Sequence, residues 1–269
     1  MFLSPEIPGI TPLVCINGGL LFDHNLLWPA LAPLAERRQL VFYDQRGRGA
    51  SQAPPGAHTA RIEHDAGDLA ALREAIGFSQ WDVLGHSWGG GLAMLAAERD
   101  RDGVRRLVLV DSVGPVGNWQ NDLLRDALPR LGPGDRAILD AIDQQALLTA
   151  DPRVHSAYSR AMYAAWFADP SLATMFAPPR SNSRTGAAVA ARLRGEGYDW
   201  SSLLRAVSVP TLVIHGEKDL LPISVAREIV STLGNVRLEI IPDAGHMPFW
   251  ESPELFFTLI ESFLSTPGA

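Results

Sequence analysis

Ser87 lies between glycines in the sequence GHSWGGG, directly after the apolar run WDVL. Gly85 and Gly89, two residues before and two after the serine, leave room for a tight turn from a strand into a helix, where larger side chains would collide. The same turn places the Trp88 amide at the start of the helix, where it can donate to a developing oxyanion. The pattern predicts that Ser87 is a nucleophile; the alternative is a glycine-rich loop that carries a solvated serine.

A serine hydroxyl attacks well only when a positioned base takes its proton, so the hypothesis requires a histidine. His246 is the candidate, because it lies in a Gly-containing loop between the last apolar run and the final predicted helix, in IIPDAGHMPFWESPELF. His86 belongs to the turn itself and should point away from Ser87, and His215 ends an apolar run and should pack near the edge of the sheet. The other histidines are expected to be solvated or structural: His24, His58, His64 and His155.

The histidine needs a buried acid that fixes its tautomer and stabilises its cation. Asp219 follows the penultimate apolar run in VIHGEKDLLP, and the order Ser87, Asp219, His246 is the nucleophile, acid, histidine order of one fold class. Two rivals stay open. Asp111 ends the run LVLVD and can reach the site from there, although capping a turn is the other role for it. Glu217 lies close to Asp219 in the sequence.

A second oxyanion donor is expected from the turn after an early strand, where CINGGLLFD supplies Gly18 and Gly19. Gly19 is the candidate for the backbone amide. A plain glycine turn without a role in binding is the alternative.

Short runs rich in valine, leucine and isoleucine should form the elements that position these residues. Runs that are apolar on both faces suit parallel strands covered by helices, and helix-length segments such as TARIEHDAGDLAALREAIG lie between them. The alternation predicts an open α/β sheet with right-handed crossovers and reactive groups at the carboxyl ends of its strands. Six strands are expected, in PLVCINGG, QLVFYDQRGRG, WDVLGHS, RRLVLVDSVG, PTLVIHGEKD and VRLEIIPDAGH.

The alternation stops near residue 117 and resumes near residue 206. The segment between is too long for a loop and has helical periodicity, so it predicts a helical cap over residues 117–205, inserted into a core of residues 1–116 and 206–269. More than half of the large apolar side chains in this segment should pack in its own core. The rest are expected to line a substrate pocket beside Ser87, with Tyr158, Met162, Trp166 and Phe167 as candidates.

Composition narrows the function classes. The chain has 269 residues, 46% of them hydrophobic, and a formal net charge of −7 without a basic run, which argues against nucleic acid and anionic lipid as partners. No apolar run approaches the roughly 20 residues that span a bilayer, and the chain starts without a cationic leader. The single cysteine, Cys15, lies in an apolar run and predicts a core residue. We expect a soluble, cytoplasmic protein.

With these residues in place, the chain resembles the α/β-hydrolase superfamily through four motifs in order: YDQRGRGAS, GHSWGG, HGEKD and GHMPFWESPELF. Within it, DQRGRGAS and GHSWGG look most like the proline iminopeptidase branch and its esterase-like relatives. The resemblance implies hydrolysis of esters or amides under a helical cap, with no metal or organic cofactor. A serine in the turn disfavours haloalkane and epoxide chemistry, which needs an aspartate nucleophile in this fold.

Three features depart from that branch. NGGLL, with Asn17, replaces the usual His-Gly-Gly-Pro-Gly at the oxyanion turn. About fifteen residues precede this turn, so the N-terminal antiparallel strands should be reduced or absent, leaving six parallel strands. The branch uses cap carboxylates to hold the free amine of a substrate, and none can be singled out here among Asp122, Asp126, Glu196 and Asp199.

The sequence therefore favours a serine hydrolase that cleaves an ester of a small-to-medium hydrophobic substrate through an acyl-enzyme. A proline iminopeptidase-like aminopeptidase is the first alternative. A lactonase, a C–C bond hydrolase and a non-catalytic ligand-binding relative are further ones. The sequence does not indicate an oligomeric state.

Overall fold

The computed structural model describes residues 1–56, 59–176, 178–179 and 181–266. A seven-stranded sheet with the order β1-β3-β2-β4-β5-β6-β7 runs through the molecule. The six expected strands are all present and parallel to one another, and β1 adds two residues antiparallel to β3, so the antiparallel part is reduced and not absent. The strands are β1 Phe2–Leu3, β2 Leu13–Ile16, β3 Leu40–Phe42, β4 Trp81–His86, β5 Val104–Val110, β6 Thr211–Gly216 and β7 Val236–Ile241.

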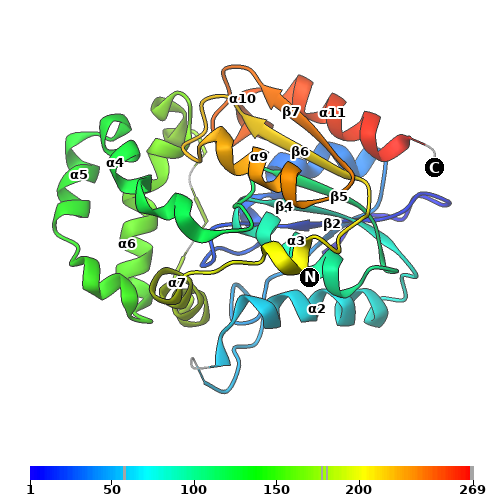
Figure 1. The fold of residues 1–269 in the computed structure, drawn as a ribbon, viewed down its shortest axis with the longest axis horizontal. Coiled ribbons are helices and arrows are strands. Elements are labelled where there is room, and N and C mark those ends of the chain that lie inside the picture. Colours follow the sequence, from blue (N-terminus) through cyan, green and yellow to red (C-terminus); the bar gives the residue numbers. More distant parts are fainter. Residues whose placement is uncertain (57–58, 177, 180, 267–269) are drawn as a thin grey trace.

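Helices cover both faces of the sheet (Figure 1), which explains why most strand residues are apolar on both faces. In β2, Val14 and Ile16 pack on one face, whereas Leu13 and Cys15 pack on the other. The first face carries α2 Ile62–Ala75, α3 Trp88–Arg99, α8 Ser201–Leu204 and α9 Ile223–Thr232. The second carries α1 Trp28–Leu31, α10 Pro248–Glu251 and α11 Pro253–Ser265.

Cys15 is buried and free, and burial raises the pKa of its thiol well above the usual range. Burial outweighs the opposing effect of the Arg38 charge on this pKa, and a buried thiol of this kind is inert, so Cys15 serves as a core residue.

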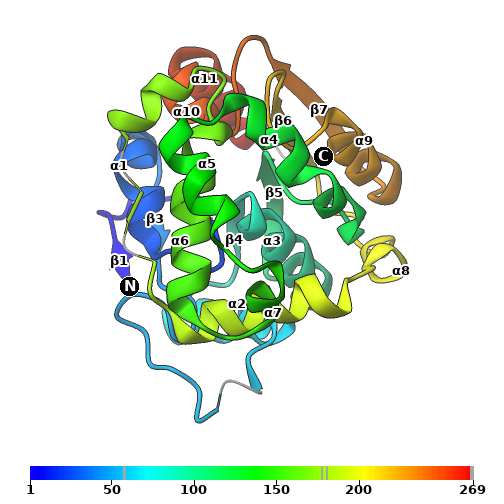
Figure 2. The ribbon, with the colours of Figure 1, turned by 90° about the vertical axis from the view of Figure 1, so that its left-hand side faces the viewer.

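Between β5 and β6 the chain forms a group of helices, which we call the cap, beside the carboxyl ends of the strands (Figure 1), and Figure 2 looks onto them. Asp151 caps α6 by accepting from the Arg153 N–H, and Ser183 caps α7 by accepting from the Gly186 N–H. The α-helices are α4 Leu123–Ala127, α5 Pro133–Asp140, α6 Pro152–Met162 and α7 Arg184–Glu196. The 3₁₀ turns are η4 Gly117–Asn121, η5 Leu128–Arg130, η6 Gln144–Leu148, η7 Tyr163–Trp166 and η8 Pro170–Thr174.

The two ends of the cap lie side by side. Val116 and Asp199 form an antiparallel bridge, the Gly117 N–H donates to the Tyr198 carbonyl at 3.0 Å, and the Trp200 N–H donates to the Pro115 carbonyl at 2.8 Å. The chain thus leaves the sheet after β5 and returns toward β6 at nearly the same place.

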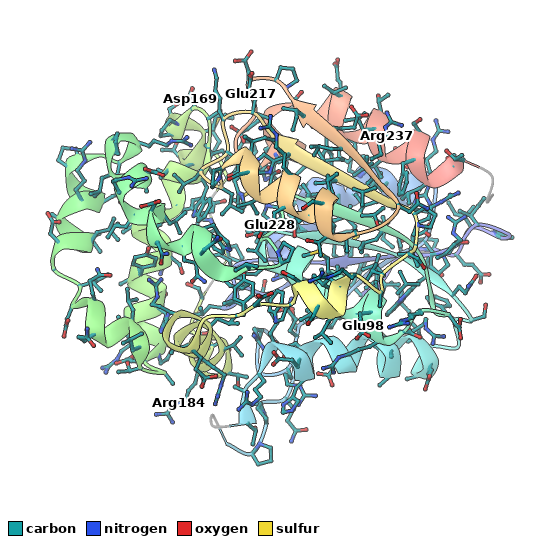
Figure 3. All side chains as sticks on the ribbon, viewed as in Figure 1. Glu98, Asp169, Arg184, Glu217, Glu228 and Arg237 are labelled. Atoms are coloured by element: carbon teal, nitrogen blue, oxygen red, sulfur yellow. The ribbon has the colours of Figure 1, made fainter. Side chains whose placement is uncertain are left out.

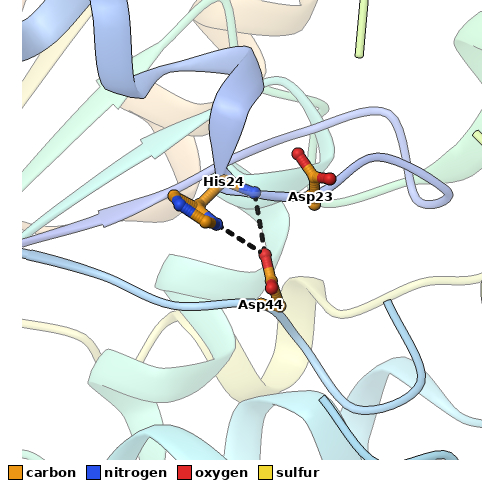
Figure 4. A group of neighbouring side chains, drawn as sticks. All are labelled: Asp23, His24 and Asp44. Carbon is orange, nitrogen blue, oxygen red and sulfur yellow. Dashed lines mark hydrogen bonds and ion pairs between the residues drawn. The ribbon is translucent and has the colours of Figure 1, made fainter. Parts of the chain in front are cut away.

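The turn after β3, which carries the DQRGRGAS motif, is fixed by Asp44. Its carboxylate accepts from the His24 backbone N–H at 3.0 Å and from His24 Nδ1 at 2.8 Å (Figure 4). It also accepts from the Ala50 N–H at 2.9 Å, and Asp23 lies beside this group. Burial alone would raise the pKa of Asp44, but the hydrogen bonds from Ala50 and His24 lower it. His24 is therefore structural, as the sequence indicates.

No helix in the described part of the chain combines the length and the apolar character needed to cross a bilayer.

Candidate active site

The strand-to-helix turn at Ser87 has the geometry that its glycines predict. Ser87 follows β4 directly, precedes α3, and has φ 56° and ψ −122°, a backbone conformation that residues other than glycine rarely adopt. A Cβ on Gly85 would overlap the Gly89 carbonyl, and a Cβ on Gly89 would overlap the Ile16 carbonyl of β2. Strain of this kind persists only where the surroundings enforce it. Here the Ser87 N–H donates to the Val110 carbonyl at 3.0 Å, and the Ser87 carbonyl accepts from the N–H groups of Gly90 and Val113.

We expect Gly89→Ala to destabilise the fold, because the added methyl group meets the backbone of a central strand, which cannot move aside. The cost should be about 1–3 kcal/mol or more, measured as the free energy of unfolding in urea. Gly134→Ala is the matched control, since Gly134 has open space around its Cα in α5. Equal stability of the two variants would contradict the tight turn.

His246 and Asp219 form a buried hydrogen-bonded pair. The loops after β7 and β6 carry them, and His246 Nδ1 lies 3.0 Å from Asp219 Oδ1 and 2.9 Å from Oδ2. The Leu221 N–H also donates to Asp219, at 3.1 Å. A carboxylate can only accept, so Nδ1 carries the hydrogen and Nε2 is left to take a proton. Burial lowers the pKa of His246 to about 3, which keeps the imidazole neutral at pH 7.

This pKa predicts the pH dependence of activity. A base must be neutral, so activity is present above the pKa of His246 in the folded protein and is lost as the pH falls through it. We expect the acid limb of kcat/KM for a neutral ester to have its midpoint below 6.5, the ordinary histidine value. A pH-rate profile, taken where circular dichroism shows folded protein, measures it. A midpoint at or above 6.5 would count against His246 as the base.

Asp111, a rival for the role of acid, lies behind Asp219. Its Oδ1 accepts from the Gly216 N–H at 2.8 Å, and its carboxyl lies against Asp219 and His215, with polar atoms of all three within 4.8 Å of one another. As a carboxylate, Asp111 would leave Oδ2 without a donor; with a proton, it donates to Asp219 instead. Burial, and then the charge of Asp219, raise the pKa of Asp111 well above its usual range.

Asp219 therefore carries the negative charge of this pair and Asp111 the proton, because Asp219 receives donors from both His246 and Leu221. Glu217, the second rival, is exposed and points outward (labelled at the top of Figure 3), and its carboxylate accepts from the Asp243 N–H. Neither rival hydrogen-bonds His246.

The turn after β2 lies directly against Ser87. A Cβ on Gly18 would lie 2.6 Å from the Ser87 Cβ, so only glycine fits there. Asn17 holds the turn by donating from Nδ2 to the carbonyls of Gly18 and Phe22, at 3.1 and 3.2 Å. Across the described residues, the N–H groups of Gly19 and Trp88 donate to no protein group. Gly19 and Trp88 line the same cavity as Ser87, which makes their amides candidates for binding an oxyanion.

Glu251 fastens the histidine loop to the cap, a role that sequence analysis missed. Its carboxylate accepts from the N–H groups of Gly245 and Met247, at 3.0 and 3.1 Å, and from that of Ala168 in the cap at 2.7 Å. The His246 N–H donates to the Trp166 carbonyl at 2.8 Å, and the two rings lie 4.3 Å apart. Glu251 occurs in the motif GHMPFWESPELF, but its partners become visible only in the fold.

One cavity joins Ser87 and His246 to the cap and contains about 940 Å³ of empty space, part of it open to solvent. Of the four pocket candidates, Tyr158, Met162 and Trp166 line it. The prediction for Phe167 is wrong: its side chain is fully buried against Tyr163 in the core under the cap. The backbone changes from the α-helix to a 3₁₀ turn at Tyr163, which shifts the helical phase on which the prediction relied.

Each cap carboxylate considered for binding an amine lies outside this cavity. Asp122 and Asp126 pair with Arg125 on the surface, and Glu196 pairs with Arg192 at 2.7 Å. Asp199 accepts from the Ser201 N–H at 2.9 Å. In fact, no aspartate or glutamate among the described residues lines the cavity.

The other histidines have structural partners. His86 donates from Nε2 to the His246 carbonyl at 2.9 Å, and burial lowers its pKa well below the usual value. His215 lies inside β6, between β5 and β7, and donates to the Leu221 carbonyl at 3.0 Å; it is not at an outer edge of the sheet. His64 Nδ1 bonds the Thr59 carbonyl, His155 lines the cavity, and His58 lies outside the described residues.

Two groups bring carboxylates and a histidine close enough to be considered for a metal: Asp23, His24 and Asp44, and Asp111, His215 and Asp219. In the first group His24 Nδ1 is bonded to Asp44, and in the second Asp219 is bonded to His246 and to the Leu221 N–H, whereas His215 Nδ1 has no hydrogen-bond partner among the described residues. We assign no metal to either.

Comparison with known proteins agrees with this architecture. A 2-hydroxymuconate semialdehyde hydrolase from Pseudomonas putida is 30% identical over 87% of this chain and 80% of its own length. A proline iminopeptidase from Lactobacillus delbrueckii subsp. bulgaricus is 28% identical over 94% of this chain and 89% of its own. A thermophilic esterase of solved structure from Thermogutta terrifontis is 26% identical, with a TM-score of 0.68 over 98% of this chain and 91% of its own.

These relatives are all hydrolases, but their names give different activities, so they show a hydrolase without fixing the bond that it cleaves. The family model for the alpha/beta hydrolase fold matches residues 11–253, which include Ser87, Asp219 and His246. The chain belongs to the α/β-hydrolase fold family.

Proposed function

We propose that the protein is a serine hydrolase that cleaves a carboxylic ester of a small-to-medium, mainly apolar substrate. The observation that carries the proposal is the buried bond between Asp219 and His246, in a cavity shared with the strained turn at Ser87. The helices of residues 117–205 act in this proposal as a cap over the site.

In the proposed mechanism, neutral His246 takes the proton of Ser87 through Nε2 while the serine oxygen attacks the ester carbonyl. Asp219 holds the Nδ1 hydrogen and stabilises the imidazolium that forms. The amides of Gly19 and Trp88 bind the oxyanion. His246 then gives its proton to the leaving alcohol, which leaves an acyl-Ser87, and a water activated by the same base releases the acid.

The walls of the cavity support an ester as the substrate. The aromatic side chains Trp119, Tyr158 and Trp166 face it, and such walls bind apolar groups. An aminopeptidase must hold the free amine of its substrate, and an acid is the usual partner for that charge. Because no acid in the described part of the chain lines the cavity, we place ester hydrolysis ahead of proline iminopeptidase activity. The similarity to a proline iminopeptidase makes that activity the second candidate.

Two measurements test the proposal. A fluorophosphonate probe should label the protein at Ser87, located by peptide mass spectrometry, and should not label Ser87→Ala. A panel of p-nitrophenyl esters is then compared with proline p-nitroanilide. Turnover of esters and not of the anilide supports the proposal, the reverse favours the aminopeptidase, and labelling with neither turnover directs the search to lactones and C–C bonds.

A further inference from the structure

Arg194 places a positive charge in the cavity that contains Ser87. It lies in the last turn of α7, half-buried, and lines the cavity together with Ala190 one turn earlier. Its guanidinium lies over the ring of Tyr158, 5.2 Å from the ring centre. The aromatic face fixes the position of the guanidinium without consuming its N–H donors.

The guanidinium of Arg194 lacks an acidic partner within the described ranges, and none of its N–H groups donates to a protein acceptor there. Arg192, on the same helix, instead pairs with Glu196 at 2.7 Å. Taking a charge out of water is costly unless a counter-charge or hydrogen bonds compensate it. A half-buried cation without a protein partner is thus available to an anion that enters the cavity.

Arg194 is also the only formally charged side chain among the described residues that line this cavity. Three histidines line it as well. Burial lowers the pKa of each, and proximity to Arg194 contributes at His155, which bonds the Thr149 carbonyl through Nε2 at 2.9 Å. The cavity therefore has a net positive charge inside a protein whose formal net charge is −7.

We propose that Arg194 binds a carboxylate carried by the substrate, so that the substrate class is a carboxylate-bearing ester. This inference rests on the proposed function and adds a specificity-determining residue to it. The guanidinium offers a planar pair of N–H donors that matches a carboxylate. A single cation suits a monoanion, and the aromatic side chains that line the same cavity suit an apolar spacer between the carboxylate and the ester.

Two matched pairs of esters test the inference, with the carboxylate on either side of the ester bond. One pair is mono-p-nitrophenyl glutarate and p-nitrophenyl pentanoate; the other is 4-acetoxybenzoate and its methyl ester. In at least one pair, the wild-type protein should prefer the anion about tenfold or more in kcat/KM, as expected for a charged hydrogen bond. Arg194→Gln should remove this preference by raising KM for the anionic ester, and should change kcat/KM for the neutral ester less than threefold.

Arg184→Gln is the matched control. Arg184 begins the same helix but is exposed on the outside of the cap (labelled in Figure 3), so this variant should keep the wild-type preference. Arg194→Lys should keep part of it, because the charge remains while the paired donors are lost. An equal loss of kcat/KM for anionic and neutral esters in Arg194→Gln would show a structural role and overturn the inference. A wild-type protein without a preference in either pair would also overturn it.

A binding measurement separates this inference from the proposed function. By calorimetry, Ser87→Ala should bind monomethyl glutarate more tightly than dimethyl glutarate. Adding Arg194→Gln should weaken the affinity for the monoanion about tenfold or more. If no ester is hydrolysed but this difference is found, the proposed function fails and the carboxylate site stands. If esters are hydrolysed but both ligands bind alike, the carboxylate site fails and the proposed function stands.

Discussion

Replacing Ser87 by alanine is expected to lower kcat for ester hydrolysis by about 10⁴-fold or more, with the fold intact. The variant keeps His246, Asp219 and the two oxyanion amides but has no oxygen to form the acyl-enzyme. Residual turnover above the water rate should remain, because oriented amides still stabilise a tetrahedral intermediate. Alanine has the same Cβ as serine, so the strained turn and its close contact with Gly18 are unchanged.

The measurement is a stopped-flow or spectrophotometric assay on protein purified free of other esterases, with thermal unfolding recorded in parallel. A midpoint within a few degrees of wild type confirms that only the nucleophile was removed. If this variant retained a tenth of the wild-type rate, Ser87 would not be the nucleophile.

The second large effect distinguishes the two buried acids. Asp219→Asn should lower kcat by about 10³- to 10⁴-fold, because an amide can donate to Nδ1 and so favours the wrong histidine tautomer. Asp111→Asn should cost tenfold at most. Its amide still donates to Asp219, as the protonated Asp111 does, and its oxygen still accepts the Gly216 N–H.

Both variants preserve size and shape, so kcat for a single neutral ester compares them directly, and circular dichroism verifies that each is folded. Equal losses would mean that the two carboxyls share the charge. A larger loss in Asp111→Asn would transfer the role of acid to Asp111.

The fold, the bond between Asp219 and His246, and the cavity that His246 shares with Ser87 could be predicted from sequence because all three depend on strand order. Ser87, Asp219 and His246 each follow an apolar strand, and the carboxyl ends of parallel strands meet at one edge of a sheet. Local patterns therefore determine a long-range proximity. The two-residue strand Phe2–Leu3 has no comparable signal, since it is too short to show a period.

The cap was predicted less well, because helical periodicity states which side chains share a face but not what that face contacts. Phe167 follows the change to a 3₁₀ turn and packs inward, whereas Trp166 reaches His246. The sequence does not indicate that Arg194 lines the cavity, since charged residues on helices usually face solvent. Only the packing of α7 against α6 places its guanidinium over Tyr158, inside the cavity.

The bonds from the histidine loop to the cap have a consequence for how the molecule moves. Glu251 and the His246 N–H both bind backbone atoms of the segment 166–168, so this segment cannot swing outward as a hinged door while the base stays in place. Detachment of that part of the cap and disabling of the base are then one event. We therefore expect substrate and product to pass between side chains at the cavity mouth while the segment 166–168 keeps its place beside His246.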